Sequence, residues 1–343
     1  TFNGKTNAGR TGNGLPEGER VWSPIGFALA HLFSKFSWSN EVWSKLHLGL
    51  WFFHMSSTMI FVAIIPYTKF FHFLALPIQA FLTPKRRGGI LGTMNSFGLS
   101  KFSEMTMKNR FDLISCVECG RCTEVCPALA AGKNLNPKTI ITKARDLAFE
   151  SHKNGIADPL FWGEKPIYEG HELDACTTCA ACMEECPAHI EHVNIIMEAK
   201  RYKALTLSDL PPSATDATNK SKIHGNPWGI SQEDRVKWAD ELNIPVITPG
   251  QKVDYLYFVG CAGSYDAANQ KAIKDTIALM KKAGVSFALL GKLEKCCGDP
   301  VRRFGDESSF LEIALGNIET FRQFKFDKIV THCPHCLHTI VKE

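Results

Sequence analysis

The sequence predicts three consecutive parts: an α-helical membrane segment, a mainly α-helical cysteine-rich domain, and a small α/β domain with a parallel sheet. Three observations support this order. Residues 46–65 contain no Asp, Glu, Lys or Arg, residues 116–187 contain one cysteine motif twice, and strand-like and helix-like segments alternate after residue 253. We divide the chain into residues 1–99, 100–205, 206–250 and 251–343, and we expect 206–250 to be a linker.

The composition narrows the class of protein. The formal net charge of +4 is too small to indicate nucleic-acid binding, and no block of Lys and Arg is interleaved with aromatic residues. The 13 cysteines are odd in number and clustered, which favours metal sites over disulfides and a reducing compartment. The residues that follow Thr1 do not resemble a signal peptide. We expect the natural chain to extend beyond one or both ends.

The uncharged run 46–65 has the length that an α-helix needs to cross a bilayer. We expect this helix to continue past Pro66 to about Leu82. An excess of basic residues after the run predicts that the rest of the chain lies in the cytoplasm. Residues 21–38 are aromatic and amphipathic, which fits either a helix at the membrane interface or an ordinary surface helix. The alternative for 46–65 is a buried helix of a soluble domain.

The motif C-x2-C-x2-C-x3-C-P occurs twice, 60 positions apart, and this spacing is typical of proteins that bind two [4Fe–4S] clusters. In them, three cysteines of one copy and the fourth cysteine of the other hold the same cluster. We expect one cluster at Cys116, Cys119, Cys122 and Cys186, and the other at Cys176, Cys179, Cys182 and Cys126. Zinc is the alternative for a single copy, but two identical copies with a trailing proline argue against it.

Five cysteines remain, and each lies near the end of one of the strands predicted at 253–259, 285–290 and 328–331: Cys261, Cys296, Cys297, Cys333 and Cys336. The ends of parallel strands meet at one edge of a sheet, so these thiols should converge. Two adjacent cysteines suit a cluster better than one small ion. A zinc site or buried thiols are the alternatives. No cysteine is left for a lone catalytic nucleophile, and no catalytic residue is identified.

Two family resemblances follow from these motifs. Residues 105–200 resemble the bacterial two-cluster ferredoxin domain of succinate dehydrogenase and heterodisulfide reductase-type subunits. The arrangement of Cys261, Cys296-Cys297-Gly298 and Cys333-x2-Cys336 resembles the Cys-Cys-Gly domain of heterodisulfide reductase catalytic subunits. Relatives include iron–sulfur subunits of glycolate, lactate and glycerol-3-phosphate dehydrogenases. The resemblance implies a third iron–sulfur cluster, which is non-cubane in some members, and a second Cys-Cys-Gly domain that this chain lacks.

A third resemblance concerns the histidines of the membrane segment. The stretch with His54, Pro66 and His72 looks like the last helix of the cytochrome b (gamma) subunit of respiratory nitrate reductases. The resemblance implies that both histidines are axial ligands of b haems, with partner ligands outside this chain. On one continuous helix their 18-residue separation would place them on the same face, roughly 27 Å apart. Histidines satisfied by hydrogen bonds in a helix bundle are the alternative.

Together these parts resemble the membrane-bound oxidoreductases that connect electron-transferring flavoprotein to menaquinone. The resemblance implies electron flow from a reduced cytoplasmic flavoprotein through iron–sulfur clusters and haem b to menaquinone. It also implies a multi-pass protein of the cytoplasmic (inner) membrane, in contact with lipid, with its iron–sulfur domains facing the cytoplasm. The alternatives are a heterodisulfide or thiol–disulfide reductase, an iron–sulfur subunit of a glycolate, lactate or glycerol-3-phosphate dehydrogenase, and a structural metal-binding scaffold.

Overall fold

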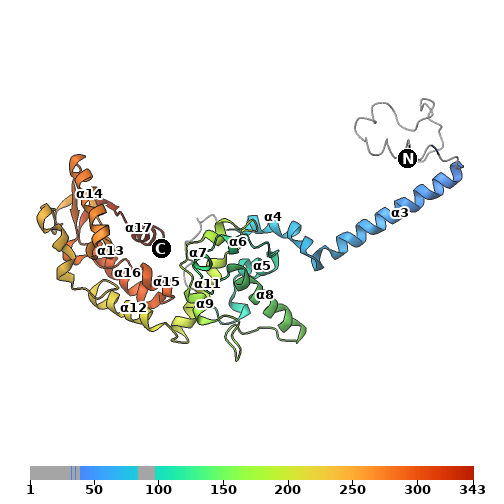
Figure 1. Ribbon diagram of the computed structural model, residues 1–343, viewed down its shortest axis with the longest axis horizontal. Helices are drawn as coiled ribbons and strands as arrows, with labels where there is room; N and C mark the ends of the chain where they lie inside the picture. The colour runs from blue at the N-terminus through green and yellow to red at the C-terminus, as the bar shows by residue number, and fades with distance from the viewer. Residues whose placement is uncertain (1–31, 33–34, 36–38, 84–96) are drawn as a thin grey trace. The chain divides into compact units, whose positions relative to one another are not determined.

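The computed structural model describes residues 32, 35, 39–83 and 97–343 (Figure 1). The chain forms two compact units, one ending at Phe70 and the other running from Phe71 to Glu343. Apart from two positions, the interfacial helix expected at 21–38 lies outside the described residues, as do the basic residues 85–87.

The first unit contains the long helix α3, Asn40–Ile64. Ser39 caps its start by accepting a hydrogen bond from the backbone N–H of Val42 at 3.4 Å. The apolar segment Glu41–Tyr67 has a mean hydropathy of 1.8, and none of it is buried within the structure. By length and composition it is able to cross a membrane, so the prediction of an apolar N-terminal helix is confirmed.

The apolar helix does not continue to Leu82 as expected. Two 3₁₀ turns and a new helix follow α3: η1 (Ile65–Tyr67), η2 (Lys69–Phe71) and α4 (His72–Leu82). Pro66 has no N–H to donate and its ring clashes with the preceding turn, and Thr68 is extended, with φ −126° and ψ 168°. His54 and His72 therefore lie on different helices, and the expectation of one shared helix face is wrong.

The second unit begins with α4 and a mainly helical region that holds the repeated cysteine motif. Its helices are η3 (Phe102–Glu104), α5 (Met107–Ser115), α6 (Arg121–Glu124), α7 (Pro127–Ala130), α8 (Pro137–Lys153), α9 (Gly170–Asp174), α10 (Ala181–Glu184) and α11 (His192–Leu205). Leu113 of α5, Ile140 of α8 and Ile195 of α11 share one hydrophobic core. The short helices α6, α7 and α10 leave their cysteines in the loops around this core.

Residues 206–250 are not the linker that their polar composition predicts. They form α12 (Pro212–His224) and the 3₁₀ segment η4 (Gln232–Leu242), and Arg235 and Trp238 are buried. The buried face of α12 consists of Ala214, Thr218 and Ser221. Small side chains allow close helix packing, but they leave no apolar periodicity for a sequence pattern to detect.

The C-terminal region is built on a small parallel sheet, as predicted. Its strands are β1 (Lys252–Tyr257), β2 (Phe287–Leu289) and β3 (Lys325–Val330), in the order β2-β1-β3. Tyr257 pairs with Leu289 on one side and with Val330 on the other, so the three carboxyl ends lie next to one another.

Helices cover both faces of this sheet (Figure 1). They are α13 (Gly260–Tyr265), α14 (Ala267–Lys282), η5 (Gly291–Leu293), α15 (Asp299–Phe304), α16 (Glu307–Phe321) and α17 (Pro334–Lys342). Leu256 and Phe258 pack in one core with Cys297 and Cys336. Tyr257 packs in another core with Ile273 and Ile277 of α14. Alternate residues of the central strand thus face opposite layers, as the pleat of a strand requires.

Candidate metal centres

The two copies of the cysteine motif share an unusual backbone conformation. Glu118 and Gly120 in the first copy have φ values of 61° and 85°, and Thr178 and Ala180 in the second have 58° and 62°. Left-handed backbone is uncommon for residues other than glycine, so these positions are strained. The strain recurs at equivalent positions because each loop must turn twice to direct three cysteines inward.

The first cysteine set, Cys116, Cys119, Cys122 and Cys186, lines one cavity. The empty volume of this cavity, counted out to its open mouth, is about 350 Å³. Cys122 and Cys186 are buried, whereas Cys119 is exposed. The first set combines three cysteines of one loop with the fourth cysteine of the other, the grouping that the motif spacing predicts.

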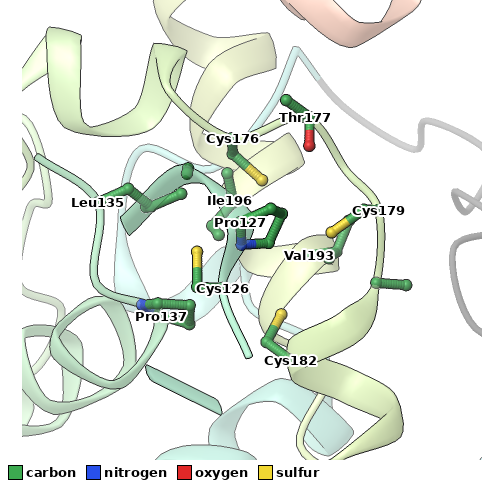
Figure 2. A pocket seen from close by; sticks show the side chains of 12 residues that line it. Cys126, Pro127, Leu135, Pro137, Cys176, Thr177, Cys179, Cys182, Val193 and Ile196 are labelled. Atoms are coloured by element: carbon green, nitrogen blue, oxygen red, sulfur yellow. The ribbon is translucent and has the colours of Figure 1, made fainter. Parts of the chain in front are cut away.

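The second cysteine set, Cys126, Cys176, Cys179 and Cys182, lines a cavity of about 320 Å³ measured in the same way. Figure 2 shows the four sulfur atoms pointing toward a shared space. Val193 and Ile196 of α11 and Leu135 form an apolar wall beside them. Among the residues described, no three Cys, His, Asp or Glu side chains converge on the position of one metal ion. Four thiols around a cavity suit a multi-iron cluster better than a single zinc ion.

Without metal, burial raises the pKa of several of these thiols. Burial is the largest cause for Cys116, Cys176 and Cys186, and for Cys122, whose pKa it raises to about 11. Backbone N–H groups oppose the effect, and that of Thr178 lies 3.4 Å from the sulfur of Cys176. Such donors stabilise metal-bound thiolate and tune the potential of an iron–sulfur cluster. The residues present therefore fit this group.

The third cysteine set, Cys261, Cys296, Cys297, Cys333 and Cys336, is brought together at the carboxyl ends of the strands. Thiol–thiol hydrogen bonds connect Cys296 with Cys261 and with Cys297, and Cys336 with Cys297 and with Cys333. Four of the five side chains are buried, and Cys333 is half-buried. The hydrogen bond from Cys336 lowers the pKa of Cys333 to about 6.

Glycine is required beside the third set. A Cβ atom on Gly260 would lie 2.9 Å from the sulfur of Cys336, and the φ of Gly260 is +75°. The backbone before Cys261 therefore approaches the thiols more closely than a side chain would allow. This close approach and five contiguous thiols fit a bound iron–sulfur cluster.

A buried ion pair supports the backbone of the third set. Glu294 accepts hydrogen bonds from the N–H groups of Val259 at 2.9 Å and Gly260 at 2.8 Å, and pairs with Arg235 at 3.0 Å. The exposed fractions of the Glu294 and Arg235 side chains are 2% and 1%. The pair thus connects the turn before Cys261 with the segment before Cys296. Sequence patterns give no signal for it, because Arg235 comes from the expected linker.

Helix α11 contacts α15 and α16 and so connects the second and third sets. The ammonium of Lys200 donates to the carbonyl oxygen of Cys176 at 2.9 Å and to that of Arg303 at 3.0 Å. Arg201 pairs with Glu307 at 3.0 Å across the same contact. Gly305 packs so closely that an added Cβ would lie 2.6 Å from the carbonyl oxygen of Lys200. The sequence predicts none of these contacts.

Helix α4 contacts the first set through a buried carboxylate. Asp112 of α5 accepts hydrogen bonds from Gln79 of α4 at 2.6 Å and from the N–H of Glu191 at 3.2 Å. Lys108 pairs with the same carboxylate and donates to the carbonyl of His189 at 2.8 Å. Burial raises the pKa of Asp112, and Lys108 opposes the effect. His189 and Glu191 follow Cys186, so α4 is connected to the loop of the first set.

The predicted haem ligands lie elsewhere. His54 is exposed on α3, and His72 is the half-buried first residue of α4. The structure does not bring these two histidines together.

The fold and the cysteine sets define an iron–sulfur protein of the oxidoreductase class. Residues 115–190 match the 4Fe-4S dicluster domain, and residues 255–341 match the cysteine-rich domain known as CCG. The chain belongs to the heterodisulfide reductase-related iron–sulfur proteins, as the resemblance of its motifs predicted. No solved structure matches the chain.

Three relatives illustrate this kinship. EtfAB:quinone oxidoreductase of Syntrophomonas wolfei is 32% identical over 92% of this chain and 49% of its own length. A probable membrane-anchored ferredoxin of Chromohalobacter salexigens is 32% identical over 72% of this chain and 39% of its own length. A dihydromethanophenazine:CoB–CoM heterodisulfide reductase subunit of Methanosarcina barkeri is 31% identical over 68% and 58%. The chain thus spans about half the length of the curated relatives it matches.

Proposed function

We propose that the chain is the electron-transferring part of a membrane-bound oxidoreductase that takes electrons from electron-transferring flavoprotein and delivers them to menaquinone. The observation that carries the proposal is a continuous series of packed contacts within residues 71–343. The third set adjoins α15, α15 contacts α11, α11 adjoins the second set, and the first set is connected through α5 to α4. Similarity to EtfAB:quinone oxidoreductase over 92% of the chain supports the same function.

In this proposal the first and second sets each hold one [4Fe–4S] cluster, and the third set holds an additional iron–sulfur cluster. Bound clusters supply one-electron transfer at potentials set by the charge and hydrogen bonds around their sulfurs. The side chains of this chain exclude water, direct the thiolates inward and place N–H donors beside them. The third set lies at the entrance of the path. The first set lies at the exit, because α4 follows the apolar helix directly in the chain.

We further propose that His54 and His72 ligate b haem together with histidines from outside this chain. His54 lies on the exposed surface of an apolar helix, where a group shared with a neighbouring helix has access to it. Replacing either histidine with alanine should remove a b-haem band from the dithionite-reduced optical spectrum. An unchanged spectrum in both variants would exclude these ligand roles and leave α3 as an anchor.

The proposed location is the cytoplasmic membrane, with residues 97–343 on the cytoplasmic side. All 13 cysteines are free thiols, which is the state expected in a reducing compartment. Labelling of Cys119 and Cys179, both exposed, tests the orientation. After iron is removed by chelation, an impermeant thiol reagent should label them in inverted vesicles and not in right-side-out vesicles.

The decisive experiment mixes the detergent-extracted full-length protein anaerobically with reduced flavoprotein and a soluble menaquinone analogue. We expect quinol formation with transient reduction of the iron–sulfur absorbance. The second candidate is a thiol–disulfide reductase, favoured by similarity to a heterodisulfide reductase subunit. Burial of four thiols of the third set restricts access by a disulfide substrate and argues against it. Disulfide reduction without quinol formation would reverse the assignment.

A further inference from the structure

Lys200 is an unusual cation because no carboxylate accompanies it. Five Lys or Arg side chains are buried in the described part of the chain: Lys200, Arg201, Lys203, Arg235 and Arg302. The last four each pair with a carboxylate, and Lys203, one turn further along α11, pairs with Asp174 at 2.8 Å. Within the described residues, no carboxylate oxygen lies within 4.0 Å of the Lys200 ammonium, and its two hydrogen-bond acceptors are neutral carbonyl groups.

A buried cation without an anion is strongly destabilising, and its presence calls for a negative charge nearby. The carbonyl that Lys200 contacts belongs to Cys176, a member of the second set. The exposed fraction of Lys200 is only 3%, so water screens its charge weakly. Thiolates that hold an iron–sulfur cluster at the second set would provide the missing negative charge.

We propose that Lys200 is a positioning residue that neutralises negative charge at the second set and raises the reduction potential of the cluster held there. The inference rests on the ligand assignment proposed above, not on the identity of the electron donor or quinone. Reduction adds one negative charge to the site, and a fixed positive charge at short range favours the reduced state. The second acceptor of Lys200, the carbonyl of Arg303, fastens this charge to α15, next to the third set. Lys200 thereby favours electron movement from the third set to the second.

The test is an EPR-monitored redox titration of the full-length protein carrying K200M, K200Q or K200R. A C119S reference, altered only in the first set, identifies which signal belongs to which cluster. For K200M and K200Q, we expect the equilibrium constant for reduction of the second cluster to fall at least tenfold, which corresponds to about 59 mV for one electron. The first cluster should shift less than threefold, and K200R should restore most of the wild-type value.

K200Q separates charge from structure. Its amide still donates hydrogen bonds to both carbonyls, so it preserves the contacts while it removes the charge. A wild-type potential of the second cluster in K200Q would overturn the inference, and so would equal shifts of both clusters. If K200M loses iron, K200Q and K200R decide the question. The titration uses dithionite and soluble mediators, so a failure of flavoprotein or quinone turnover leaves its outcome intact.

Discussion

The contact between α11 and α15 is the part of the proposed path that a single added methyl group should disturb most. In Gly305→Ala, the new Cβ would lie 2.6 Å from the carbonyl carbon and oxygen of Lys200 and 3.0 Å from the N–H nitrogen of Arg201. These are backbone atoms and cannot rotate away. The φ of Gly305 is +95°, which an alanine adopts only with strain.

The cost has two parts. Left-handed backbone at a non-glycine residue costs about 1–2 kcal/mol, and overpacking of a close contact costs about 1–3 kcal/mol. The loss of unfolding free energy should therefore be about 2–5 kcal/mol unless α15 moves away from α11. If α15 moves, the hydrogen bond from Lys200 to Arg303 breaks and the third set loses its connection to the second.

Hydrogen exchange of the full-length protein, read by mass spectrometry, measures this effect. We expect faster exchange in α11, α15 and α16, a lower melting temperature, and slower reduction of the second cluster by a donor that enters at the third set. Iron content should stay at the wild-type level, because Gly305 contacts no cysteine among its nearest atoms.

Gly316→Ala is the matched control. Gly316 lies in α16, and an added Cβ would meet nothing within 4 Å. Replacing a helix-interior glycine with alanine at an open position should stabilise the protein by about 0.5–1 kcal/mol. The reasoning fails if Gly305→Ala retains the wild-type melting temperature and exchange protection, or if both variants destabilise the protein equally.

Three further predictions concern the buried polar groups and the thiols. In Glu294→Gln, Arg235 keeps its buried charge without a carboxylate, so the local cost should reach about 3–5 kcal/mol and iron should be lost from the third set only; iron analysis and EPR test this, and full iron content would contradict it. Gln79→Met removes a buried hydrogen bond to Asp112 and should cost about 1.5–3 kcal/mol, with faster hydrogen exchange in α4 and α5; unchanged exchange there would refute the link. The metal-free pKa of Cys122 is about 11, so its proton must leave before iron binds. Lowering the pH from about 9 to 7 should therefore reduce iron loading of the first set during reconstitution, and equal loading at both pH values would exclude this coupling.

The sequence by itself determined the chemistry of the sites. The spacing in the two motifs predicted which four cysteines share each cavity, because a three-cysteine loop can surround only part of a cluster. Cys261, Cys296 and Cys333 follow successive predicted strands, and parallel pairing brings such positions to one edge. The apolar run 46–65 marked the potential membrane helix, since its length and lack of charge need no tertiary context to be read.

Only the tertiary structure decided how these sites are connected. Lys200 and Gly305 are one charged and one small residue among many, and their roles depend on contacts about a hundred positions apart. Arg235 and Glu294 form a pair only after η4 packs beside the sheet, and a polar composition hides this packing. The break at Pro66 likewise depends on how the chain leaves α3. Sequence patterns record which local faces are apolar, whereas long-range pairs of buried polar groups are defined only when the chain is folded.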